Sequence, residues 1–582
     1  MEKKKATIDV AQKKGFASLI GGTMKKRGIM TWLCAVCILF FLTAAACQNP
    51  PSTDSDMSGQ ADGEKTGILE GDQKDNPGGA EGAPGNLPEE TTEPQGAPEP
   101  ESTAVLVSIP EGLESFDGAL VTVNGEKLPL YQVMVNTSQT WNGDTKTREP
   151  AGVGYMELAK GTAAVTVTLP YEIDYSSRVR PLSEGIIPVA DLENRTLSFE
   201  ITRPGAYTIE PNDDRRKAIH LFVTALAQEV PQDGKVLYFE AGLHTAENNP
   251  LISKNNVVTL TSGTTVYLET GAVVRAKFLA NNASDITIMG HGIIDGSAFV
   301  RNSYTGEVTV PLEFNHCSNI TLKDISVLDP AGWCVNFYFV RESKIDGMKI
   351  ITSRSNGDGI SIQSCQDITV SGCFVRSWDD SLVVKNYPDW GNRSIQGETA
   401  GIVFENCILW TDLAQSMEIG YETVGSKMED ITFRDITVLH ALHRAPISIH
   451  NANNADIRNV RYENIVIEDA SMTQGDTKGG SPVMEITAAY SPTWSDQHTV
   501  TGLGSVEGVT INGLKVLSGS KNISIGISGS VDTREGYLDE HWIRDISFWN
   551  VEIKGTLWNE ETANLQCNRY TEHITITEGK ER

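Results

Sequence analysis

The sequence predicts an all-β protein, a right-handed parallel β-helix preceded by a small β-sandwich. A short phrase of alternating apolar and polar residues occurs in eight copies after residue 280. Period-2 alternation marks strands with one buried face, and its recurrence over many units indicates a solenoid. The same region contains no stretch with the spacing of a long helix. About 100 residues before it show short alternating strands separated by turn residues, which is typical of a sandwich.

Length and charge narrow the function classes. The chain has 582 residues, which predicts two or more folded units. Its formal net charge of −28 argues against nucleic-acid binding, which needs clustered Lys and Arg. Nine cysteines do not form a disulfide framework in so long a chain, and those after residue 47 lack Cys-x-x-Cys spacing. We therefore expect no metal site and no cofactor.

The pattern of residues 1–47 indicates an export segment. Lys25-Lys26-Arg27 precede an apolar run, Ile29 to Ala46, the order found in a secretory signal. The run ends at Cys47 and resembles a bacterial lipoprotein signal, which implies lipidation of Cys47 and an extracellular, surface-tethered protein. An uncleaved membrane anchor is the alternative, because about 18 apolar residues nearly span a bilayer. Whether Met1 or Met24 is the true start stays open.

Three further segments follow. Residues 48–103 are rich in Gly, Pro, Ser and acidic residues and predict a disordered linker. Residues 104–212 predict the β-sandwich, with Asn124-Gly125 as a hairpin turn. We expect this domain to cap the open end of the β-helix, with carbohydrate binding as the alternative. Residues 213–575 predict the β-helix itself.

Two copies of the repeated phrase are Ile320 to Ile325 and Ile431 to Ile436. The Gly, Asn or Asp just before the second strand predicts a residue with positive φ that bends each coil. Cys373 and Cys407 occupy the slot that holds isoleucine in other copies. We therefore predict that both cysteines fill the core.

A second set of strands can be aligned by inward-facing apolar pairs. Ile360 and Ile362 match pairs on the next three coils. This alignment predicts three columns running up successive coils: Asp358, Asp380, Gln415 and Ala445; Ser361, Val383, Glu418 and Ser448; Gln363, Lys385, Gly420 and His450.

The alignment makes Asp358, Asp379 and Asp380 neighbours. Asp358 and Asp380 are 22 residues apart, one coil, and coils lie ~4.8 Å apart. Like charges so close repel and raise a pKa, so the cluster favours function over structure. Glycoside hydrolysis needs one protonated and one ionised carboxyl, and the inverting form needs them ~6.5–9.5 Å apart.

Asn356-Gly357-Asp358, Asp379-Asp380 and Lys385 resemble the active-site motifs of glycoside hydrolase family 28, the polygalacturonases. They also resemble family 49, the dextranase group of the same clan, and the resemblance covers about residues 230–470. It implies that Asp379 is the general acid, that Asp358 and Asp380 position and deprotonate the water, and that Lys385 contacts the acid or the sugar.

The departures from the polygalacturonase pattern concern the substrate. Ala414-Gln415-Ser416 stands where those enzymes carry Gly-His-Gly, and Ser448-Ile449-His450 stands where they carry Arg-Ile-Lys. Without that Arg and Lys a uronate lacks fixed cations, and Glu418 adds a negative charge. We therefore expect an α-linked, neutral, dextran-like glycan rather than polygalacturonate, although Arg444 or His443 could compensate. The candidate substrate-binding residues are Asn356, Lys385, Gln415, Glu418, Tyr421 and His450.

Two other functions stay open. One is a β-helix polysaccharide lyase, which resembles pectate lyases with an Arg base and calcium; no Arg aligns beside these acids. The other is a non-catalytic, carbohydrate-binding surface protein, against which the strained acid cluster argues. We expect a monomer whose partner is a polysaccharide or oligosaccharide and whose membrane contact is through the N-terminus alone.

Overall fold

The computed structural model describes residues 103–137, 148–300, 310–472, 482–493, 495, 502–532, 534 and 539–579. Residues 1–102, with the predicted export segment, Cys47 and nearly all of the predicted linker, lie outside this part. Among the described residues, one-turn 3₁₀ helices lie at Leu182–Glu184, Pro211–Asp213 and Arg215–Lys217, and strands and turns make up nearly all of the remainder. None of the described helices is long and apolar enough to cross a membrane.

The first domain is a sandwich of two sheets around an apolar core. The predicted hairpin is present, since β2 pairs antiparallel with β3 and the turn residues Asn124 and Gly125 have positive φ. One sheet has the order β3 (Glu126–Leu128), β2 (Leu120–Val123), β6 (Ala163–Thr168), β9 (Thr196–Ile201), β8 (Val189–Asp191). The other has the order β1 (Thr103–Leu106), β5 (Arg148–Lys160), β11 (Ile219–Thr224), β10 (Gly205–Glu210), β7 (Arg178–Arg180), with β4 (Leu130–Asn136) also on β5. The sandwich sheet therefore extends to Thr224, beyond the predicted boundary at residue 212.

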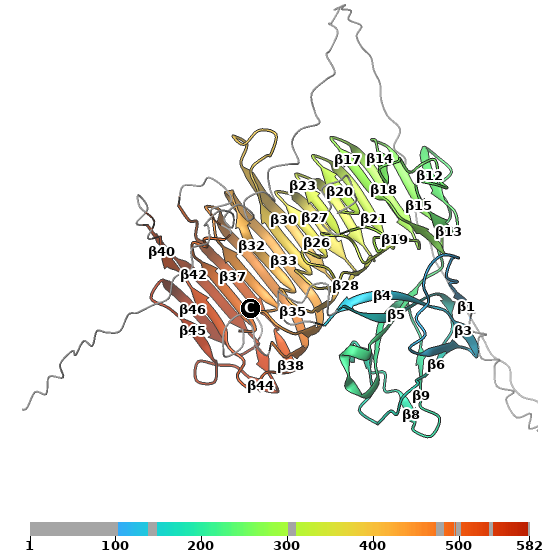
Figure 1. Ribbon diagram of the computed structural model, residues 1–582. Helices are drawn as coiled ribbons and strands as arrows, with labels where there is room; N and C mark the ends of the chain where they lie inside the picture. Colours follow the sequence, from blue (N-terminus) through green and yellow to red (C-terminus); the bar gives the residue numbers. More distant parts are fainter. Residues whose placement is uncertain are drawn as a thin grey trace, which may run out of the picture. The chain divides into compact units, whose positions relative to one another are not determined.

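The second domain is a parallel β-helix, as predicted, and Figure 1 shows its coils following one another from β12 to β46. A typical coil has one strand in an 11-stranded parallel sheet and two in a 22-stranded sheet. The 11 strands are β14 (Val257–Leu260), β17 (Lys277–Asn281), β20 (Leu312–Asn315), β23 (Val335–Tyr338), β26 (Ile360–Gln363), β29 (Leu382–Asn386), β32 (Met417–Thr423), β34 (Ile447–Asn451), β36 (Met484–Ala488), β39 (Ile525–Ser528) and β45 (Leu565–Cys567).

The 22-stranded sheet supplies the other sides of the coils, and the repeated phrase of the sequence lies on it. Its strands are β12 (Lys235–Phe239), β13 (Gly242–His244), β15 (Thr264–Leu268), β16 (Ala272–Val274), β18 (Ser284–Gly290), β19 (Ile293–Asp295), β21 (Ser318–Lys323), β22 (Ser326–Leu328), β24 (Arg341–Asp346), β25 (Lys349–Ile351), β27 (Gln366–Ser371), β28 (Phe374–Ser377), β30 (Gly397–Glu405), β31 (Ile408–Thr411), β33 (Gly425–Ala441), β35 (Asp456–Ala470), β37 (Val506–Asn512), β38 (Lys515–Gly519), β42 (Ile543–Trp549), β43 (Glu552–Ile553), β44 (Thr556–Leu557) and β46 (Thr571–Thr577). A separate two-stranded pair joins β40 (Ser530–Val531) to β41 (Glu540–His541).

The predicted bend in each coil is confirmed. The residue before the second strand has positive φ, which Gly tolerates freely and Asn and Asp more readily than other residues. These residues are Gly290, Asp324, Gly347, Gly372, Asn406, Asp435, Asn464, Gly513 and Asn550. Cys373 and Cys407 are each 1% exposed inside the continuous core of the coils, so the prediction that they fill the core is also confirmed.

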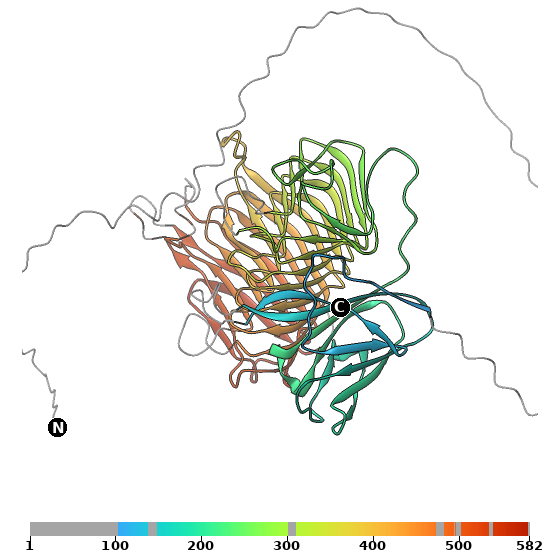
Figure 2. The same ribbon diagram turned by 45° about the vertical axis from the view of Figure 1, so that its right-hand side comes forward.

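The sandwich packs along the side of the coils, so the expectation that it caps the open end is wrong. An apolar cluster joins Tyr131, Tyr155 and Phe222 to one residue from each of seven coils. Figures 1 and 2 show the strands of the sandwich beside the coils. The seven coil residues are Val273, Ile293, Leu328, Ile351, Phe374, Trp410 and Leu439. Coils that carry outward-facing aromatic and aliphatic side chains on consecutive turns need a covering layer along their length.

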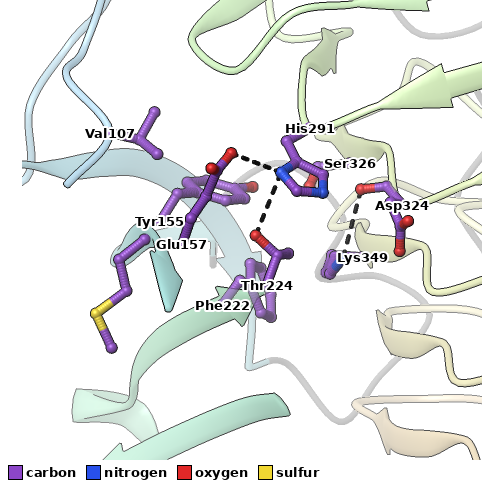
Figure 3. A pocket seen from close by; sticks show the side chains of 10 residues that line it. Val107, Tyr155, Glu157, Phe222, Thr224, His291, Asp324, Ser326 and Lys349 are labelled. Atoms are coloured by element: carbon purple, nitrogen blue, oxygen red, sulfur yellow. Dashed lines mark hydrogen bonds and ion pairs between the residues drawn. The ribbon is translucent and has the colours of Figure 1, made fainter. Parts of the chain in front are cut away.

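Charged groups are also buried in this contact. Arg180 lies 2.6 Å from Glu210 of its own domain and 2.6 Å from Glu468 of the β-helix. His440 lies 2.6 Å from the other oxygen of Glu210. Nearer the first coils, Nδ1 of His291 lies 2.7 Å from Glu157, beside a small cavity between the domains (Figure 3).

Candidate active site

The three aspartates lie at one corner of two adjacent coils, where the 22-stranded sheet gives way to the 11-stranded one. Asp358 precedes β26, and Asp379 and Asp380 lie between β28 and β29. The two corners are joined by backbone hydrogen bonds: Asp379 N–H donates to the Gly357 carbonyl over 3.4 Å, and Gly359 N–H donates to the Asp380 carbonyl over 2.8 Å. The fold thus brings the predicted catalytic residues together.

The predicted alignment of the apolar pairs is confirmed. Ile360 pairs with Leu382, Leu382 with Met417, and Met417 with Ile447, and the second member of each pair follows the same register. Ser361, Val383, Glu418 and Ser448 form the predicted outward column, and all four are fully buried. The side chains of this column are therefore shielded from solvent.

Small residues let the two coils approach. A Cβ at Gly359 would lie 2.4 Å from Cγ1 of Val375 and 2.5 Å from the carbonyl oxygen of Ser381, so only glycine fits there. Beside the aspartates a chain of hydroxyl hydrogen bonds joins the corners of two adjacent coils, with spacings of 2.7, 2.7 and 2.8 Å. Its members are Ser377, Ser381, Thr411 and Ser416. This chain fixes the corner from which Asp379 and Asp380 project.

The three carboxyls are buried and interact electrostatically. Exposed fractions are 2% for Asp358, 8% for Asp379 and 9% for Asp380. Burial raises the pKa of all three, and repulsion by Asp379 raises the pKa values of Asp358 and Asp380 further. Carboxyls coupled in this way lose their protons as a group, and at least one is held protonated above its ordinary range.

Several donors favour ionisation within the same cluster. The positive charges of Lys385 and Arg444 lower the pKa of Asp379, and the backbone N–H groups of Asp380 and Asn356 donate to its carboxylate. The backbone N–H of Gln415 donates to Oδ1 of Asp380 over 3.1 Å. The cluster therefore combines burial and repulsion, which favour the protonated carboxyl, with cations and N–H donors, which favour the carboxylate, and acid–base catalysis uses both forms.

Asn356 and Gln415 contribute backbone groups. Asn356 has φ of 52°, and its side chain is exposed beside the buried aspartates. Gln415 is 4% exposed and follows Asp380 in the predicted column, since Ser381 N–H donates to the Gln415 carbonyl over 2.9 Å.

Lys385 is a buried cation next to the cluster. It is 8% exposed, and its Nζ lies 3.2 Å from Glu422 and 5.5 Å from the centre of the Trp333 ring. Burial alone would lower its pKa, but Glu422, Tyr387 and the aspartates outweigh burial, so its pKa is raised well above the ordinary value. Lys385 therefore stays charged.

Glu418, Tyr421 and His450 form a second group on β32 and β34. His450 Nδ1 lies 2.8 Å from Glu418 and its Nε2 lies 3.4 Å from Glu485, while Tyr421 stacks on the ring at 4.1 Å. Ser448 also donates to Glu418. Burial alone would lower the pKa of His450, but the two carboxylates raise it to about 9. The imidazolium charge is thus balanced inside the protein.

One predicted contact is wrong. Lys385 does not pair with Gly420, because the register shifts between Val384 and Asn386. The single residue Lys385 lies opposite three residues of β32, and the last of these is Glu422. Glu422 is not among the predicted site residues, because a bulge leaves no trace in an alternating sequence pattern. Arg444, which the sequence offers only as a possible compensating cation, does act on Asp379, from a turn between strands. Among the described residues, no group of three or more His, Cys, Asp or Glu side chains is arranged to hold a metal ion.

Comparison with known proteins gives three findings. Residues 229–475 match the family model of glycosyl hydrolases family 28. A probable polygalacturonase of Vitis vinifera is 25% identical over 169 residues, which are 28% of this chain and only 34% of that protein's length. The solved structure of Dex49A from Penicillium minioluteum has a TM-score of 0.52 at 12% identity, covering 81% of this chain and 96% of that one. The last likeness shows a shared fold.

Proposed function

We propose that this chain, whose β-helix is a glycoside hydrolase domain of the family 28 type, cleaves glycosidic bonds with inversion at its aspartate cluster. The observation that carries the proposal is the burial of Asp358, Asp379 and Asp380 together at one corner of adjacent coils. Burial raises the pKa of all three, and repulsion by Asp379 raises the pKa values of Asp358 and Asp380 further. Folding stability alone gives no reason to bury three adjacent acids. A reaction that uses a protonated and an ionised carboxyl at the same time does give a reason to bury them together.

The roles follow the family resemblance and not the order of the pKa values, because the pKa values of Asp358 and Asp380 are raised well above the ordinary range while that of Asp379 is raised by burial alone. Asp379 donates a proton to the oxygen of the leaving sugar as the glycosidic bond breaks. Asp358 and Asp380 hold a water molecule on the opposite side and accept its proton as its oxygen bonds to the anomeric carbon. The Lys385 cation stabilises the ionised carboxylates while the proton moves.

We propose a neutral α-linked glycan as the substrate. The site holds six carboxyl groups, and three cations accompany them: Lys385, Arg444 and His450. Lys385 is already paired with Glu422, and His450 with Glu418 and Glu485. A uronate carboxylate would therefore meet an excess of negative charge. The six carboxyl groups belong to Asp358, Asp379, Asp380, Glu418, Glu422 and Glu485.

A glycan panel tests both parts. Purified protein is incubated with neutral α-glucans, including dextran, and with polygalacturonate, and new reducing ends are counted. We expect reducing ends from a neutral glucan and few from polygalacturonate. Release from polygalacturonate alone would contradict the substrate proposal. A product that absorbs in the ultraviolet and is lost on chelation would indicate a lyase and contradict hydrolysis.

We also propose that the protein is exported, lipidated at Cys47 and monomeric. The support is the order of charged, apolar and small residues before Cys47, which lies outside the described residues. Labelled fatty acid should enter the wild type and not a Cys47→Ala variant, and light scattering should give the mass of one chain. Equal labelling of both proteins would contradict lipidation at Cys47, and a mass of two or more chains would contradict the monomer.

A further inference from the structure

We propose that Glu422 is a positioning residue that holds Lys385 charged and aimed at the catalytic carboxyls. The inference rests on the proposed function, and it concerns a residue brought to the site by a bulge. Neither the repeat pattern nor the motifs that carry the family resemblance include Glu422.

The bulge is local to the site. Val384 pairs with Ile419 and Asn386 pairs with Thr423, so one residue of β29 lies opposite three residues of β32. The pairing of β32 with the next strand stays regular through this point, since Gly420 pairs with His450. A Cβ at Gly420 would lie 2.2 Å from the His450 carbonyl oxygen, so glycine is needed where the strand bends. Bulges next to active sites re-aim a side chain, and here the side chain is Glu422.

The contacts of Glu422 are those expected of a residue that holds the Lys385 cation in place. Its carboxylate lies 3.2 Å from Nζ of Lys385. The side chain of Glu422 is 6% exposed and that of Lys385 is 10% exposed. The Tyr387 hydroxyl donates to the same carboxylate. Burial alone would raise the pKa of Glu422, but Lys385 and Tyr387 lower it, so Glu422 is an anion across the working pH range.

A permanent anion beside Lys385 separates the task of pairing with the lysine from the task of transferring protons. The aspartates must gain and lose protons during each turnover, so none of them can be a constant partner of the lysine. Glu422 supplies that partner, and Lys385 keeps its charge and place whichever aspartate is protonated. Glu422 also raises the pKa of Asp358 directly. It therefore acts on the chemistry through Lys385 and Asp358, without a role for itself as acid or base.

The test is the pH dependence of kcat/KM for Glu422→Gln, which keeps the shape and removes the charge. We expect kcat to fall at least about tenfold and the acid limb to move to lower pH by about half a unit or more, because Asp358 loses a neighbouring anion. KM should change less than kcat. Glu422→Asp should restore part of the rate and move the limb back.

Glu313→Gln is the matched control. Glu313 is on β20 of the same sheet and is ion-paired with Lys277, outside the site. This variant should keep the wild-type pH profile. An unchanged profile in Glu422→Gln, or the same shift in Glu313→Gln, would overturn the inference while leaving hydrolysis intact.

A measurement without substrate separates the two proposals. If the wild type cleaves no glycan, the proposed function fails. The Glu422–Lys385 ion pair is then tested by measuring the unfolding of Glu422→Gln, Lys385→Met and the double variant at pH 7. We expect the double variant to lose less free energy of unfolding than the sum of the two single losses, because each single change leaves a buried charge without its partner. Additive losses would overturn the inference.

Discussion

The backbone N–H of Gly359 donates a hydrogen bond over 2.8 Å to the carbonyl oxygen of Asp380, and this contact sets the geometry of the site. It fixes Asp358, one residue earlier, beside Asp380 of the next coil. The strand register maintains this proximity although both carboxyls are buried and both pKa values are raised. The fold therefore holds together groups that repel one another, and this has a measurable consequence for stability.

Asp358→Asn should stabilise the protein at pH 7. The folded-state pKa of Asp358 lies above its unfolded value, so its ionised form is disfavoured in the fold. Its contribution to stability is full below the unfolded pKa and is lost as pH rises through the folded pKa. Removing the charge should raise the free energy of unfolding by on the order of 1 kcal/mol at pH 7, with the gain shrinking towards pH 3. Urea unfolding at both pH values measures it.

The exposed Asp233 provides the control, because Asp233→Asn should change stability by less than about 0.5 kcal/mol at either pH. A loss of stability in Asp358→Asn at pH 7 would show that the carboxylate is a structural group.

Arg180→Ala should destabilise the protein by about 3–5 kcal/mol, because it removes the cation that Glu468 and Glu210 share and leaves only His440 beside Glu210. Arg203 gives a matched comparison: it pairs with Glu184 while its side chain is 65% exposed. Arg203→Ala should lose no more than about 1 kcal/mol. Equal losses from the two variants in urea unfolding would mean that the charged contact between the domains adds nothing.

His450→Gln should reveal a pH-dependent contribution to stability. The folded pKa of about 9 lies above the unfolded 6.5, so the contribution is full below pH 6.5 and is lost as pH rises through 9. The shift corresponds to on the order of 3 kcal/mol. Wild type should therefore exceed the variant in stability at pH 6 far more than at pH 10. The exposed His573, paired with Asp545, provides the control variant His573→Gln, which should show little of this dependence. A difference for His450→Gln that is the same at pH 6 and pH 10 would contradict the paired imidazolium.

Much of the β-helix follows from the sequence because its pattern is local. Alternation identifies the strands, and the Gly, Asn and Asp positions identify the bends, so Asp358 and Asp380 can be placed on adjacent coils without a structure. The same reasoning fails where the pattern breaks. Lys385 was aligned with Gly420, and the bulge put Glu422 there instead.

Contacts between segments that are far apart in the chain cannot be predicted from the sequence pattern either. Phe222 of the sandwich packs against Phe374 of the coils, with ring centres 5.1 Å apart. Their apolar character predicts burial, but it does not say against which surface. The sandwich was therefore expected at the end of the helix and lies along its side.

The rate of hydrolysis by Asp379→Asn, with the anomer of the wild-type product followed by NMR, tests the central claim most directly. On a glycan that the wild type cleaves, we expect the first product to have the inverted anomeric configuration. The variant should be slower by about two to four orders of magnitude, because an amide cannot donate the proton that the leaving oxygen needs. Hydrolysis at the full rate in Asp379→Asn, or a first product with the retained configuration, would contradict the account.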